Sequence, residues 1–83
     1  MSKKEIVVEY FAVLSQEAKT ASEIVLTDAE TVEELFHELK RSHSFSLSQK
    51  QVKAAINNKV ASNWQCSISS GDRILFIPPL VGG

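Results

Sequence analysis

The 83-residue sequence contains little glycine, proline or cysteine. Three glycines and two prolines are too few for a collagen-like or low-complexity chain. The only cysteine, Cys66, cannot form an intramolecular disulfide. Small secreted domains usually carry several disulfides, so this composition favours a reducing compartment. We therefore expect a small globular protein of the cytoplasm.

The sequence also lacks an excess of basic residues and a long apolar run. Nine Lys plus Arg stand against ten Asp plus Glu, which gives a net charge of −1, and the cations are scattered. This pattern argues against nucleic acid and against a polybasic membrane anchor. The longest apolar run, residues 74–81, contains both prolines and is far shorter than the roughly 20 residues of a membrane span. We expect neither nucleic acid nor membrane as a partner.

The usual catalytic groupings are missing as well. His37 and His43 are six residues apart and do not share a helix face as an i, i+4 metal pair would. No phosphate-binding glycine loop and no Gly-x-Ser-x-Gly motif occurs. We expect both histidines to be solvated on a helix surface and Cys66 to be a buried or half-buried structural thiol. The sequence predicts no metal site, no bound cofactor and no catalysis by this chain alone.

The first half of the chain predicts two strands and a helix. Residues 4–12 are rich in β-branched and aromatic side chains, and their even positions, Ile6, Val8 and Tyr10, are uniformly apolar and should face the core. Residues 13–22 predict a loop with one helical turn around residues 14–19. Residues 22–27 predict a second strand, antiparallel to the first.

A helix should begin at Thr31, where a reciprocal capping box with Glu34 is expected. Its apolar stripe falls at i, i+3, i+4 and i+7, and the helix should end near residues 42–44. The stripe consists of Val32, Leu35, Phe36 and Leu39.

The second half predicts strands at 52–57, 59–61 and 73–77, with tight turns at Asn57-Asn58 and at residues 69–72. Phe45 and Leu47 should cover the edge of the core. One helix across a mixed sheet of four to five strands is a two-layer α+β domain. A β-grasp arrangement, with parallel first and last strands at the sheet centre, explains why those strands are the most apolar. We assign residues 1–77 to this domain.

Residues 78–83 predict an extended, flexible tail that ends in Gly-Gly. Fully extended, six residues reach about 20 Å, which is enough to enter a cleft in another protein. Two glycines before a free carboxylate make a thin segment that partner backbone can approach closely. The tail residues are Pro78, Pro79, Leu80, Val81, Gly82 and Gly83.

The sequence resembles the small, sulfur-carrying subunit of molybdopterin synthase, a ubiquitin-like β-grasp protein. Residues 71–83 contain that family's Gly-Asp turn, apolar strand, Pro-Pro and terminal Gly-Gly in the same order. Residues 8–12, ending in Phe-Ala, are similar to its first strand, and residues 54–57 to its Ala-Val-Asn strand. One departure is visible, since residues 13–17 lack the basic residue that some members place there.

The resemblance implies that the chain is a non-catalytic sulfur carrier in molybdenum cofactor biosynthesis. An ATP-dependent activating enzyme, an adenylyltransferase, would convert the Gly83 carboxylate to an acyl adenylate. A sulfur donor protein would then replace AMP, leaving a thiocarboxylate. The carrier would insert its tail into the large synthase subunit and deliver sulfur to cyclic pyranopterin monophosphate. A heterotetramer of two small and two large subunits is implied by the same resemblance.

A docking surface should accompany the tail. If the even positions of the first strand are core, four outward-facing residues should form an apolar patch that continues into Pro78, Leu80 and Val81. The four are Val7, Phe11, Leu75 and Ile77. Other functions remain open: sulfur transfer for thiamine synthesis or tRNA thiolation, a ubiquitin-like protein modifier, or an interaction module with an inert tail.

Overall fold

The computed structural model describes residues 3–79, which contain five strands, two α-helices and one short 3-10 helix. The elements are β1 (Lys4–Tyr10), α1 (Val13–Ala18), β2 (Ser22–Thr27), α2 (Val32–His43), the 3-10 helix η1 (Gln49–Gln51), β3 (Lys53–Ile56), β4 (Lys59–Val60) and β5 (Arg73–Ile77). The predicted strands and the main helix are confirmed. The helical turn expected after β1 is the six-residue helix α1.

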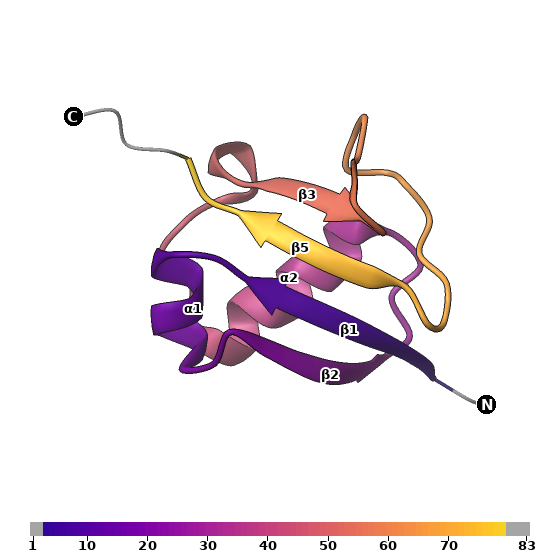
Figure 1. Ribbon diagram of the computed structural model, residues 1–83, viewed down its shortest axis with the longest axis horizontal. Helices are drawn as coiled ribbons and strands as arrows, with labels where there is room; N and C mark the ends of the chain where they lie inside the picture. The colour runs from indigo at the N-terminus through magenta and orange to yellow at the C-terminus, as the bar shows by residue number, and fades with distance from the viewer. Residues whose placement is uncertain (1–2, 80–83) are drawn as a thin grey trace.

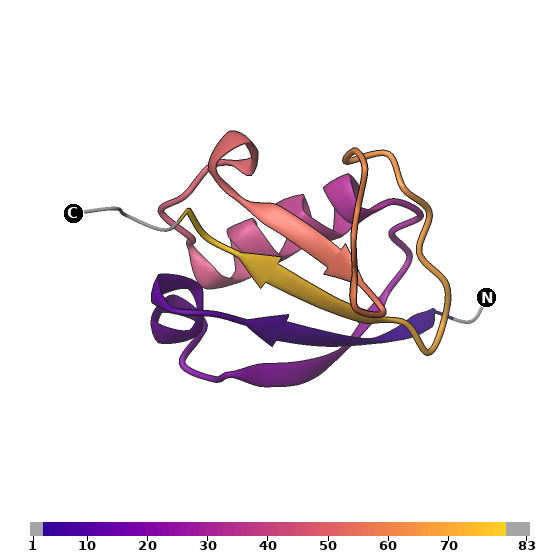
Figure 2. The same cartoon turned by 45° about the horizontal axis from the view of Figure 1, so that its top comes forward.

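The strands form one mixed sheet in the order β2-β1-β5-β3-β4 (Figure 1). β1 pairs with β5 in parallel, and the other three pairs are antiparallel. The first and last strands therefore lie next to each other inside the sheet, and the predicted β-grasp arrangement is confirmed. The carboxyl ends of β1 and β5 point to the same end of the molecule (Figures 1 and 2).

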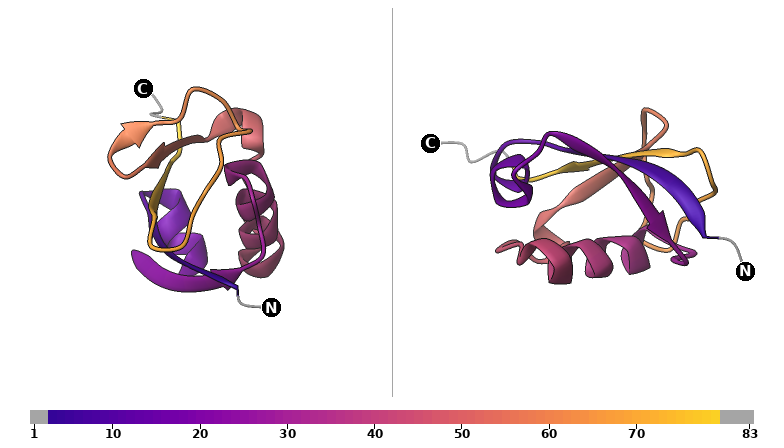
Figure 3. Two further views of the ribbon diagram at one scale, coloured as in Figure 1. Left: turned by 90° about the vertical axis from the view of Figure 1, so that its right-hand side faces the viewer. Right: turned by 90° about the horizontal axis from the view of Figure 1, so that it is seen from below.

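Helix α2 covers one face of the sheet and leaves the other face without a helical layer (Figure 3). Its predicted stripe, Val32, Leu35, Phe36 and Leu39, is buried. These side chains pack with the inward positions of β1 and β5, and Ile6, Val8, Ile74 and Phe76 are all fully buried. We call the sheet face away from α2 the outer face.

The amino terminus of α2 is capped, but not by the reciprocal box that the sequence suggested. The Oγ1 atom of Thr31 accepts from the backbone N–H of Glu34 at 3.2 Å. The Glu34 carboxylate accepts instead from the N–H of Glu30 at 2.8 Å, which satisfies a donor one residue earlier. At η1, the Gln51 side chain accepts from the backbone N–H of Ser48 at 3.0 Å, and the Gln51 N–H donates to the Ser48 carbonyl.

The tight turns adopt the left-handed backbone expected for their residues. Asn57 and Asn58 have φ of 51° and 74°, as a two-residue hairpin between β3 and β4 requires. Gly71 has φ of 93° and leads into β5. Among the described residues, no helix combines the length and apolar character needed to cross a membrane.

The prediction that His43 is solvated is wrong. Strand β2 turns Glu23 toward the helix side of the sheet, where the Tyr10 hydroxyl donates to its carboxylate. His43 Nε2 lies 2.7 Å from the same Glu23 oxygen. The His43 ring also packs in a T-shaped arrangement with Tyr10 and in a tilted one with Phe45. The aromatic and carboxylate partners at the end of α2 therefore half-bury this histidine, whereas His37 is exposed.

Tyr10 should make the domain sensitive to alkali. Burial, and then the hydrogen bond and charge of Glu23, raise the pKa of the Tyr10 phenol well above its ordinary value of about 10. Stability from this group is therefore complete below pH ~10 and is lost as the pH rises further, because only the unfolded chain ionises easily. Tyr10 is the only tyrosine. We expect phenolate absorbance to appear together with unfolding, followed by the fluorescence of the single tryptophan, Trp64.

The variant Tyr10→Phe is the control for this titration, since its stability should lose the alkaline dependence. Phenolate absorbance that rises near pH ~10 while the Trp64 fluorescence remains native would contradict the prediction.

Candidate functional site

The candidate site is the end of β5, from which the chain continues into the predicted tail. Leu80, Val81, Gly82 and Gly83 lie outside the described residues. Pro79 is exposed, but Pro78 is buried. The exposed patch predicted from the sequence therefore does not include Pro78. The reason is strand alternation: Ile74, Phe76 and Pro78 occupy successive inward positions, so the pattern extends one residue beyond β5.

Val7, Phe11, Leu75 and Ile77 all lie outside the core, as predicted for the outer face. Phe11 is 54% exposed and the other three are half-buried. Their role in docking remains a prediction. Phe11 follows Tyr10, whose Cα partner across the parallel pair is Phe76. Phe11 is thus the first residue after β1, and Ile77 is the last residue of β5, beside the start of the tail.

The patch is not purely apolar. Glu9 stands between Val7 and Phe11 on the same side of β1, and its carboxylate lies 3.9 Å from Arg73 Nε. This exposed pair contributes little stability. It divides the outer face into an apolar area around Val7 and a second one around Phe11 and Ile77, next to the tail.

Three large apolar residues on the outer face were not identified from the sequence. Ile24, Leu26 and Val60 are each more than 60% exposed. Alternation in residues 22–27 is visible in the sequence, but it does not say which side faces the core. The apolar side of β2 faces outward because Glu23 is held inside by Tyr10 and His43.

A groove of about 520 Å³ lies at the origin of the tail. We call it the tail-root groove, and it is lined by Lys50, Gln51, Lys53, Ile77, Pro78 and Pro79. Lys53 is the ladder partner of Ile77, so β3 brings its ammonium group to the outer face beside the last residue of β5. Lys50 comes from η1. The position of these lysines beside the tail could not be predicted from the sequence, because it results from the pairing of β3 with β5.

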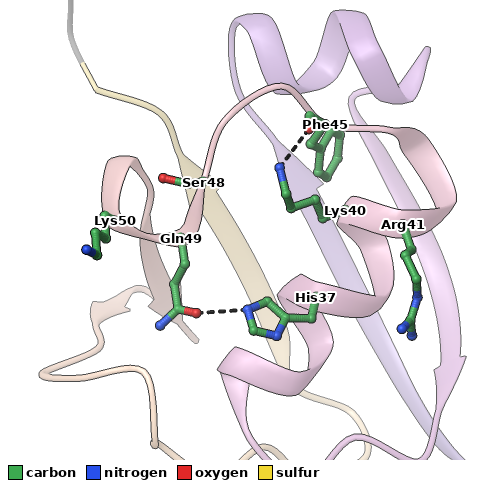
Figure 4. Close-up of a pocket in the computed structure, with 7 residues that line it drawn as sticks. All are labelled: His37, Lys40, Arg41, Phe45, Ser48, Gln49 and Lys50. Atoms are coloured by element: carbon green, nitrogen blue, oxygen red, sulfur yellow. Dashed lines mark hydrogen bonds between the residues drawn. The ribbon is translucent and has the colours of Figure 1, made fainter.

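A larger hollow, of about 850 Å³, opens between α2 and the segment that follows it (Figure 4). We call it the helix-end pocket, and it is lined by His37, Lys40, Arg41, Phe45, Ser48, Gln49 and Lys50. His37 Nε2 lies 2.9 Å from Gln49 Oε1, which closes one side. Lys40 Nζ donates to the carbonyls of Phe45 and Leu47, each at 2.9 Å, and so fixes the segment after the helix.

Cys66 is half-buried and packs against the core, as the sequence predicted. A hydrogen bond from the Asn63 backbone is the main cause that lowers the pKa of its thiol. Within residues 3–79, no group of three His, Cys, Asp or Glu side chains is arranged to hold a metal ion.

Comparison with protein families identifies one match: residues 8–83 fit the ThiS family. No curated protein sequence matches the chain. Several solved structures share its fold, and three of them illustrate the likeness. The HVO 2177 protein of Haloferax volcanii has a TM-score of 0.80 at 17% identity, covering 99% of this chain and 89% of that one.

The small archaeal modifier protein SAMP1 of Methanosarcina acetivorans has a TM-score of 0.77 at 19% identity, with both chains fully covered. The complex of subunits 1 and 2 of the molybdopterin-converting factor from Helicobacter pylori contains a chain with a TM-score of 0.67 at 22% identity. That match covers 95% of this chain and 99% of the other. At these identities the likeness establishes the fold.

Proposed function

Because the chain belongs to the ThiS family, a family of ubiquitin-like sulfur carriers, we propose that it carries sulfur on Gly83 for molybdenum cofactor synthesis. The observation that carries the proposal is the family match together with a central strand that directs the chain out of the sheet at Pro78 and Pro79. A carrier needs a folded domain that presents a carboxylate and a surface that its enzymes recognise. The domain itself need not be catalytic.

The proposed reaction begins at the Gly83 carboxylate, which is a poor acyl donor. Its oxygen attacks the α-phosphate of ATP on an activating enzyme, and pyrophosphate leaves. Hydrosulfide delivered by a sulfur donor protein then attacks the acyl carbon, and AMP leaves with the electron pair of the broken C–O bond. The product is a thiocarboxylate. Inside the large subunit of molybdopterin synthase, its sulfur bonds to cyclic pyranopterin monophosphate, and water cleaves the acyl–sulfur bond, which returns Gly83 as a carboxylate.

The proposed docking surface lies beside the tail. A protein that accepts the tail must approach the residues from which the tail starts. There Phe11, directly after β1, and Ile77, at the end of β5, offer apolar area. Exposed apolar residues of this kind are typical of partner sites. The acid, base and substrate-binding groups would belong to the partners.

The fold is shared with the modifier SAMP1 of Methanosarcina acetivorans, so a ubiquitin-like modifier is the second candidate function. In that case the acyl adenylate of Gly83 would pass to a lysine amine and form an isopeptide bond. Sulfur transfer for thiamine synthesis or tRNA thiolation would use the same thiocarboxylate with a different acceptor.

Intact mass distinguishes a carrier from a modifier. The protein is incubated with the activating enzyme, ATP and a sulfur source. We expect replacement of one carboxyl oxygen by sulfur, and no such change after deletion of Gly83. The control Lys19→Ala, at an exposed position after α1, should exchange like the wild type. Ladders of protein conjugates would instead indicate a modifier, and exchange that survives the Gly83 deletion would rule out the proposed site.

The docking surface is tested by Phe11→Asp and Ile77→Asp. A carboxylate buried against an apolar partner surface is costly, so each variant should weaken binding to the large synthase subunit by about tenfold or more. The matched control is Ile24→Asp, which is 64% exposed on β2 of the same face, away from the tail. Far-UV circular dichroism and a urea midpoint check the fold. Binding of Phe11→Asp equal to that of the wild type would contradict the prediction.

A further inference from the structure

We infer that the protein which receives the tail places an acidic polypeptide segment in the tail-root groove and the adjoining helix-end pocket. This inference rests on the proposed function, because it assumes a tail-receiving protein. It adds the chemistry by which that protein recognises the carrier: carboxylates that meet Lys50, Lys53 and Arg41.

The tail-root groove combines an apolar wall with unpaired cations. Ile77, Pro78 and Pro79 supply the wall, while Lys50 and Lys53 are exposed at its margin. Within residues 3–79, the ion pairs are Lys3 with Asp28, His43 with Glu23 and Arg73 with Glu9. Neither groove lysine is in one of them. Both ammonium groups are therefore available to a partner beside the start of the tail.

The two hollows share Lys50, so they adjoin at η1. The helix-end pocket adds Lys40, Arg41 and His37 from the last turns of α2. Neither hollow is lined by an aspartate or a glutamate. The cations that line the two hollows run from Lys53 on β3 through Lys50 on η1 to Arg41 on α2, and the other side of Arg41 borders Asp28, Glu34 and Glu38. The carboxyl end of α2 carries partial negative charge. The positive charge of the two hollows therefore comes from the Lys and Arg side chains alone.

The geometry favours an extended acidic segment over a compact anion. A single phosphate or nucleotide is usually held by several donors that converge on it. Here the Lys40 ammonium is directed at two backbone carbonyls. Lys50 and Arg41 stand on opposite sides of the pocket in Figure 4. Cations spread in this way fit carboxylates spaced along a chain, with apolar side chains of that chain against Ile77 and Pro79.

Nucleic acid is a weaker occupant for the same path. Single strands are held by aromatic side chains that stack on bases as well as by cations. The only aromatic ring besides histidine that lines either hollow is Phe45, and that side chain is buried. The apolar wall at the tail root also suits a polypeptide better than a phosphate backbone.

The test compares two double variants of equal charge. Lys50→Glu with Lys53→Glu removes the groove cations, and Lys19→Glu with Lys59→Glu makes the same change at exposed positions outside both hollows. Binding to the activating enzyme and to the large synthase subunit is measured by stopped-flow fluorescence and calorimetry, at low and at high salt. Urea midpoints of both variants establish that they fold.

We expect the groove variant to bind at least one of the two proteins about tenfold or more weakly than the control variant at low salt. The difference should shrink at high salt, as it does for charge-steered association. Equal binding of the two double variants overturns this inference and leaves the proposed function intact. A wild-type chain that binds neither protein overturns both. Binding of both double variants to tRNA is measured as well. If the groove variant binds tRNA more weakly than the control variant but binds both proteins equally well, the cations bind nucleic acid and this inference is overturned.

Discussion

The parallel pairing of β1 with β5 is the constraint on which the rest of the structure depends. β5 is the last element of the sequence, so it can pair with β1 and β3 only after the rest of the domain has been synthesised. Since parallel strands run the same way, the residues after β1 and after β5 leave the sheet at the same end. Tyr10 and Phe76 are ladder partners there although most of the chain lies between them. The position of the proposed docking surface beside the tail is therefore a consequence of the topology.

The segment between β4 and β5 shows how this pairing is supported. It has no regular structure, yet its carbonyls at Trp64 and Cys66 accept the N–H groups of Glu33 and Val32 at the start of α2. Those donors have no partner within the helix. The Trp64 ring packs against both α2 and β5, with its centroid 5.4 Å from that of Phe36 and 6.4 Å from that of Phe76. The loop thus links the helix start to the strand that carries the tail.

Local patterns in the sequence predicted the elements and most of the core. Ile6, Val8 and the stripe of α2 are buried where alternation and helical spacing place them. The α+β fold class was also predicted from the residue patterns. The proposal of sulfur transfer came from the family resemblance. Predictions failed where a side chain responds to partners distant in sequence. Glu23 faces inward because Tyr10 and His43 bind it, and no pattern within residues 22–27 contains that information.

The tail-root groove was beyond sequence analysis for the same reason. Lys50 and Lys53 resemble ordinary solvated lysines until β3 pairs with β5 and sets them beside Ile77. Because both lysines are exposed, the residues proposed for recognition differ from the buried residues that stabilise the fold. Substitutions at buried positions such as Phe76 remove core packing, whereas exposed lysines can change with little effect on stability. If the Gly-Gly tail is common to carriers and modifiers, a choice between partners must depend on residues that are free to vary. The margin of the tail root supplies such residues, at the point that every tail-receiving protein must approach.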